Sequence, residues 1–180
     1  LASTLKSLEL KPDNPDAHMN LGVIYKDLGD LDQALASTLK SLELKPDNPD
    51  AHMNLGGIYK DLGNLDQALA STLKSLELNP DNPTAHMNLG GIYKDLGDLD
   101  QALASTLKSL ELKPDNPGAV QNLKGFIKEQ NFSASNAKDL TRAYELLLNQ
   151  TDVSHRNLRR IFLQAFLATI QKASTSDSII

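Results

Sequence analysis

A unit of 34 residues repeats along most of the chain, and this period constrains the fold more than any other feature. Each copy restarts at a leucine, and these leucines are Leu1, Leu35, Leu69 and Leu103. A proline keeps the same phase throughout, at Pro15, Pro49, Pro83 and Pro117. A period between about 20 and 50 residues indicates a stacked-repeat architecture. Such a solenoid presents a long surface that holds another molecule, so we expect a binding protein rather than an enzyme.

Each repeat reads as two helices joined by a short turn. Pro15 suits the first position of a helix, and Asn14 before it is a candidate cap. Gly29 then predicts the end of this helix and a turn. A second apolar pattern at helical spacing runs from Leu31 to Leu44, and Pro46 prevents it from continuing. Helices of about 12–14 residues are marginal alone, so neighbouring helices must stabilise them.

Small residues recur at fixed positions inside the predicted helices. Glycine in a helix interior costs about 1 kcal/mol relative to alanine, so its retention in every full copy needs a reason. We expect these residues to allow a close approach between the two helices of a repeat. The glycines are Gly22, Gly56 and Gly90, and the small residues of the second helix are Ala34, Ala68 and Ala102.

These residues carry a resemblance to a known family. The pattern in the first full copy is Leu21-Gly22, Tyr25, Gly29, Ala34 and Pro46, and it recurs twice more. It resembles the tetratricopeptide repeat over about two-thirds of the chain. His18 stands where the family usually has tryptophan, and Thr38 where it has an aromatic residue. The resemblance implies an all-α fold: a right-handed superhelix of antiparallel helix pairs, with an irregular helical cap at the C-terminal end.

The repeat phase predicts the organisation of the whole chain. Because Leu1 matches Leu35, the chain begins inside a second helix, and we expect it to be a piece of a longer protein. The predicted units are a second helix of a truncated repeat (1–14), three repeats (15–48, 49–82 and 83–116), a degenerate helix pair (117–149), a C-terminal helix (150–173) and a tail or linker (174–180). In the degenerate pair Lys124 replaces the packing glycine, which should prevent the usual close approach.

One asparagine per repeat is the first candidate for binding. It precedes the Leu-Gly pair, or the Leu-Lys pair of the degenerate copy, and the set is Asn20, Asn54, Asn88 and Asn122. It resembles the asparagine ladder in the repeat superhelix of O-GlcNAc transferase, and the first helices line the concave face in this family. A side-chain amide has donors and acceptors, so it can pair with a peptide backbone of any sequence. Alternatively, these side chains satisfy local hydrogen bonds.

Two further rows lie beside the asparagines. A flexible methionine suits an adaptable binding surface, but it is equally a filler between helices; this row is Met19, Met53 and Met87. The lysines further along the helix could hold a carboxylate, as in chaperone-binding members of the family, or form a solvated charged stripe beside the aspartates that follow them. They are Lys26, Lys60 and Lys94.

Composition excludes several other functions. A net charge of −5 argues against a general nucleic-acid partner. The chain has no cysteine, and its longest apolar stretch, near Ile161–Ile170, is too short to span a bilayer. Residues of the histidine row, at positions 18, 52 and 86, are too far apart to share one zinc ion, so we expect neither metal nor cofactor. A reducing cytoplasmic setting is the default expectation.

The sequence therefore predicts a non-catalytic scaffold that holds an extended peptide or a partner protein on its concave face. No motif for phosphate binding or nucleophilic catalysis is present. Two alternatives stay open. The segment from Asn136 to Leu148 weakly resembles the joint of cyanobacterial proteins in which such repeats precede a methyltransferase-like domain, so the chain could be an accessory region of a larger enzyme. The near-identical units could also stack end to end in self-association.

Overall fold

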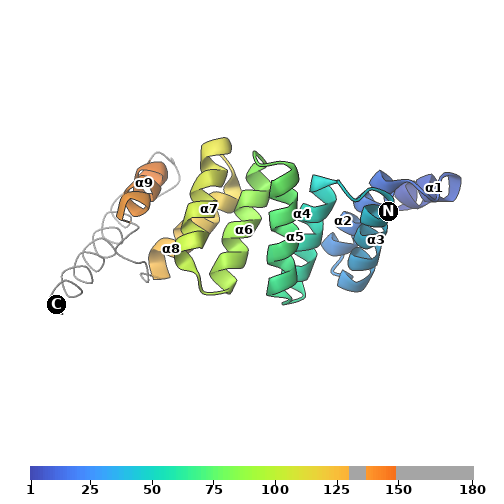
Figure 1. Cartoon of the computed structure of the whole chain (residues 1–180), viewed down its shortest axis with the longest axis horizontal. Coiled ribbons are helices and arrows are strands. Elements are labelled where there is room, and N and C mark those ends of the chain that lie inside the picture. Colours follow the sequence, from blue (N-terminus) through green and yellow to red (C-terminus); the bar gives the residue numbers. More distant parts are fainter. Residues whose placement is uncertain (130–136, 149–180) are drawn as a thin grey trace.

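The computed structural model describes residues 1–129 and 137–148 and folds this part of the chain into helices (Figure 1). They are α1 (Ala2–Leu10), α2 (Pro15–Asp27), α3 (Leu31–Leu44), α4 (Pro49–Asp61), α5 (Leu65–Leu78), α6 (Pro83–Asp95), α7 (Leu99–Leu112), α8 (Pro117–Glu129) and α9 (Ala137–Leu148). The predicted C-terminal helix and tail, with a basic patch at Arg156, Arg159 and Arg160, lie outside the described residues.

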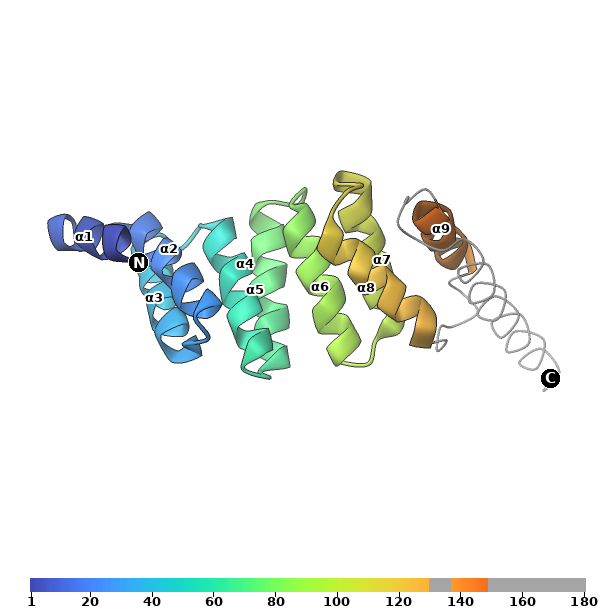
Figure 2. The same ribbon diagram turned by 180° about the vertical axis from the view of Figure 1, so that it is seen from behind.

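The helices form a solenoid, which confirms the predicted all-α repeat fold. Helices α2 and α3, α4 and α5, and α6 and α7 pack as pairs, and the pairs follow one another in a row (Figure 1). Consecutive first helices, α2, α4, α6 and α8, also contact each other, whereas the second helices stand farther apart. The first helices therefore line the inner side of the row, which the opposite view brings forward (Figure 2). In residues 1–129 and 137–148, every helix is too short or too polar to cross a bilayer.

The turn inside each repeat is formed by one glycine and its neighbours. Gly29, Gly63 and Gly97 have φ angles of 80°, 78° and 84°, a left-handed conformation that favours glycine. After α2, the N–H of Asp30 donates to the carbonyl of Tyr25 at 2.9 Å, which closes the helix end. The Asp30 side chain then accepts from the N–H of Gln33 at 3.1 Å and caps α3. One residue thus ends the first helix and begins the second.

The expected close approach between paired helices is confirmed. A β-carbon placed on Gly22 would overlap Oγ1 of Thr38 and lie 3.2 Å from the Ala34 carbonyl oxygen. The same contacts recur at Gly56 and Gly90. Ala34 and Thr38 are fully buried. The helix-weakening glycine is therefore retained because the backbones of α2 and α3 meet at this point.

The histidines connect each first helix to the loop before it. His18 Nε2 lies 2.8 Å from the carbonyl oxygen of Pro12, and His52 and His86 make the same hydrogen bond with Pro46 and Pro80. The residue that replaces the family's usual tryptophan thus forms a polar contact that holds the entry to the helix.

The C-terminal end departs from the repeat. Helices α8 and α9 pack less extensively than the regular pairs, and α9 also packs directly on α7. Lys124 stands at the position of the packing glycine, where a long side chain cannot allow the usual approach. The described end instead has its own apolar cluster, in which Phe126 of α8, Leu107 of α7 and Ala143 of α9 are all buried.

Candidate functional site

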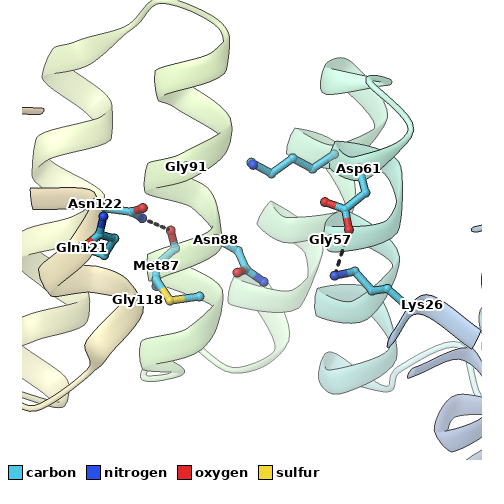
Figure 3. Close-up of a pocket in the computed structure, with 10 residues that line it drawn as sticks. Lys26, Gly57, Asp61, Met87, Asn88, Gly91, Gly118, Gln121 and Asn122 are labelled. Atoms are coloured by element: carbon cyan, nitrogen blue, oxygen red, sulfur yellow. Dashed lines mark hydrogen bonds and ion pairs between the residues drawn. The ribbon is translucent and has the colours of Figure 1, made fainter. Parts of the chain in front are cut away.

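A groove of about 290 Å³ opens on the inner side of the solenoid, between consecutive first helices (Figure 3). Helices α2, α4, α6 and α8 all contribute to it. Its lining residues are Lys26, Gly57, Lys60, Asp61, Met87, Asn88, Gly91, Gly118, Gln121 and Asn122. Five of the ten predicted site residues line the groove, and the other five lie elsewhere along the same helices: Met19, Asn20, Met53, Asn54 and Lys94. The described residues around it form no cluster of metal-ligating side chains. The chemistry that this surface offers is hydrogen bonding.

Bare backbone forms part of the groove surface. Gly57 of α4 and Gly91 of α6 occupy the position that Val23 holds in α2. A β-carbon on Gly57 would lie 3.5 Å from Cε of Lys26, and one on Gly91 would lie 3.3 Å from Cε of Lys60. The lysine stems therefore cross over the next helix where no side chain stands in the way. Glycine at such a position also lets the backbone of a bound chain approach closely.

The lysine row is paired with aspartates of the following repeat. Lys26 Nζ lies 3.0 Å from Asp61, and Lys60 Nζ lies 3.1 Å from Asp95. Each pair links two consecutive first helices, so the partner is not the aspartate adjacent in sequence. The side chains are more than one-third exposed, and such pairs contribute at most about 1 kcal/mol each. Their main effect is to balance the charge of the groove.

The asparagine row divides into two kinds. Asn122 donates through Nδ2 to the carbonyl of Met87 at 3.1 Å, so α8 is bonded to α6 (Figure 3). Within the described part of the chain, the amides of Asn20, Asn54 and Asn88 make no side-chain hydrogen bond. Asn88 points into the groove. The local-bond alternative therefore describes Asn122, and three amides remain available to a ligand.

The methionines lie at the contacts between consecutive first helices. Nδ2 of Asn48 lies 3.8 Å from Sδ of Met19, and the Asn82 amide lies 3.7 Å from Sδ of Met53. Met87 touches Gly118 and also lines the groove. This geometry favours a packing role between helices for Met19 and Met53, whereas Met87 also forms part of the groove surface.

Several groove residues were not among the predicted ones. Gly57, Gly91 and Asp61 line it, as do Gly118 and Gln121 of the degenerate copy. The change from Val23 to Gly57 and Gly91 in the next two copies could have indicated the groove. The loss of a side chain at this position of the first helix leaves space on the inner face. The role of Asp61 could have been predicted by pairing Lys26 with the equivalent aspartate of the next repeat instead of with the adjacent Asp27.

Three tetratricopeptide models match the repeats. A tetratricopeptide (TPR) repeat model matches residues 23–63 and 56–97. Two tetratricopeptide repeat models match residues 4–36 and 83–116. No characterised protein sequence matches the chain significantly.

Solved structures of low sequence identity share the fold. A crystal structure of MamA has a TM-score of 0.62 and 20% identity, covering 97% of this chain and 87% of its own. The first TPR of Spaghetti (RPAP3), bound to the HSP90 peptide SRMEEVD, has a TM-score of 0.59 and 24% identity over 62% of this chain and 89% of its own. The Arabidopsis OM64 TPR domain has a TM-score of 0.61 and 19% identity over 64% of this chain and 95% of its own.

Proposed function

The chain belongs to the tetratricopeptide repeat family, and from this premise we propose that it is a non-catalytic scaffold that holds an extended peptide segment on its inner face. The supporting observation is the row of amides at Asn20, Asn54 and Asn88, which are free of side-chain hydrogen bonds within the described part of the chain. Tetratricopeptide repeats are in general protein-interaction modules, and one structure of similar fold holds a peptide. The partner of this chain is thus a peptide or protein.

Backbone recognition suits the geometry of the row. Equivalent helices in a packed stack recur about every 8–10 Å, close to the length of three residues of an extended chain. Each amide can donate to a carbonyl and accept from an N–H of such a chain. Gly57 and Gly91 leave room for its backbone beside the amides. We therefore expect recognition that depends little on the ligand's side chains.

Charge balance separates this proposal from carboxylate recognition. Lys26 and Lys60 are both paired with aspartates, so a carboxylate would have to break an ion pair to reach either lysine. An acidic peptide would also meet Asp61 in the groove. A neutral backbone with polar groups requires no such exchange, and this favours the amide row as the recognition surface.

Replacing both Asn54 and Asn88 by alanine is expected to weaken peptide binding about tenfold or more, because several hydrogen bonds to the ligand are lost. The measurement is an array of short peptides of varied sequence, followed by fluorescence anisotropy on the peptides that bind. Helical circular dichroism should stay unchanged, since Asn54 and Asn88 form no internal side-chain bond with described residues.

The matched control replaces Asn64 and Asn79, two exposed asparagines at helix ends away from the groove. Its affinity should equal that of the wild type. Equal binding by the groove variant and the control would remove the amide row from the proposal. Absence of peptide binding by the wild type would direct attention to self-association, which light scattering against concentration measures.

Changing Asp61 and Asp95 to asparagine is expected to make the groove favour acidic peptides, which the wild-type groove should disfavour. The change removes two negative charges and releases Lys26 and Lys60 from their partners. A peptide ending in glutamate and aspartate should then bind about tenfold more tightly at low salt, and the gain should shrink as salt rises. Anisotropy at two ionic strengths measures this. Strong binding of that acidic peptide to the wild type would instead support a carboxylate site.

A further inference from the structure

The groove contains an amide that does not belong to the row of asparagines. Gln121 of α8 lines the groove directly beside Asn122 (Figure 3). In the other first helices this position is a methionine, at Met19, Met53 and Met87. The degenerate copy has therefore exchanged a thioether for a carboxamide at a position that faces the groove, and a carboxamide can both donate and accept hydrogen bonds.

The two neighbouring amides of α8 differ in what they bond. Nδ2 of Asn122 donates to the carbonyl of Met87 at 3.1 Å, which ties α8 to α6. Gln121 is exposed, and its amide has no hydrogen-bond partner among the described residues. The asparagine that continues the row in sequence is thus used inside the fold. The amide that α8 leaves available to a ligand belongs to the residue before it.

The helix surface one turn before Gln121 carries no side chain of α8. Gly118 stands there, three residues earlier and on the same face, where the regular repeats have aspartate or threonine. A β-carbon on Gly118 would overlap Sδ of Met87, so the thioether lies over this bare backbone. A ligand that passes from Asn88 to Gln121 therefore crosses Met87, a flexible side chain without charge.

Charge divides the groove along the solenoid. Its charged lining residues come from α2 and α4, and they are Lys26, Lys60 and Asp61. The described lining residues of α6 and α8 are all uncharged. A charged ligand side chain over α8 would therefore find no counter-ion among the described lining residues of those two helices. A carboxamide side chain needs none, because it can both donate to and accept from the Gln121 amide.

We propose that Gln121 is the ligand-binding residue of α8, and that it hydrogen-bonds a carboxamide side chain, such as glutamine, of the bound peptide. The inference rests on the proposed function, because it concerns the same peptide in the same groove. It adds a choice of ligand residue at one end: the asparagine row holds the backbone, whereas Gln121 selects a side chain. The segment of the ligand that lies over α6 and α8 is accordingly uncharged.

The probes are four fluorescent peptides with the host sequence GAGAGXGAGAG, in which X is glutamine, glutamate, lysine or leucine. The host has no polar side chain, so X alone can contact Gln121 through a polar group. Fluorescence anisotropy on the full chain should show glutamine binding at least about fivefold more tightly than the other three. Gln121→Glu should make the lysine peptide the tightest, and Gln121→Lys should favour the glutamate peptide. Gln121 is exposed, so both variants should keep the wild-type circular dichroism.

Two controls separate this inference from the proposed function. Gln67→Glu adds the same charge at an exposed glutamine of α5 outside the groove, and it should leave the order of the four peptides unchanged. Asn54→Ala with Asn88→Ala should weaken all four peptides together, because the backbone contacts are lost.

The possible failures are distinguishable. If the double asparagine change weakens binding but the four peptides bind the wild type equally, the assignment of Gln121 is overturned and the amide row stands. An unchanged order of the peptides in both Gln121 variants would have the same meaning. If none of the four peptides saturates the chain by about 1 mM, this inference and the proposed function are overturned together.

Discussion

Replacing Gly56 by alanine is expected to lower the free energy of unfolding by up to about 2 kcal/mol. The new β-carbon would overlap Oγ1 of Thr72 and stand 3.1 Å from the carbonyl oxygen of Ala68, a backbone atom that cannot turn away. Overpacking of this kind costs about 1–3 kcal/mol, and the better helix propensity of alanine returns about 1 kcal/mol. Chemical denaturation measures the change, and adding Thr72→Ala should recover part of it.

The adjacent glycine provides the matched control. A β-carbon on Gly57 would meet only the end of the Lys26 side chain, with Cε at 3.5 Å and Nζ at 3.9 Å, which are ordinary contacts. Gly57→Ala should therefore raise the free energy of unfolding by about 0.5–1 kcal/mol, through helix propensity alone. A gain in stability at both positions would show that α4 and α5 are not in close contact at Gly56.

The second large effect concerns serines that are identical in sequence but differ in their bonds. Ser41 and Ser75 are fully buried, and their hydroxyls have no hydrogen-bond partner in the described structure. A buried polar group without a partner costs about 1–3 kcal/mol. Changing both serines to alanine should therefore stabilise the chain by at least about 1 kcal/mol in total, seen as a higher denaturation midpoint.

Ser109 should respond in the opposite direction. Its hydroxyl donates to the Pro83 carbonyl at 2.7 Å and accepts from the Asn116 amide at 3.0 Å. Ser109→Ala leaves both groups without this partner and should destabilise by about 1–2 kcal/mol. The propensity gain from serine to alanine is common to all three sites, so the difference in sign isolates the hydrogen bonds. Equal effects at all three would contradict this assignment.

The repeat itself could be predicted because its signals are local. Proline at the first helical position, glycine in the left-handed turn and small residues at the helix contact each act within one unit. The pairing of Gly22 with Ala34 followed from that logic, and the structure confirms the close approach. The amide row could also be located from its phase in the repeat.

Contacts between repeats were harder to predict, because they depend on how consecutive helices cross. Lys26 reaches Asp61 only because α2 and α4 bring them together over Gly57, and sequence adjacency pointed instead to Asp27. The same holds for Asn122, which bonds to the backbone of the preceding first helix where its counterparts do not. The burial of Leu107 beside α9 likewise depends on how the degenerate helix pair packs, which the 34-residue period does not contain.

The bonds between repeats join consecutive units, and this determines how the chain comes apart. Lys26 bonds to Asp61, Met19 to Asn48 and Asn122 to Met87, each one unit along. Helix α1, which contains no buried residue, has little to lose when it separates. Hydrogen exchange should therefore be fast in α1 and slow towards the middle repeats, because opening proceeds from the end inward. On heating, the terminal helices should therefore unfold before the middle repeats. Probes placed at different points along the sequence should then report different melting temperatures.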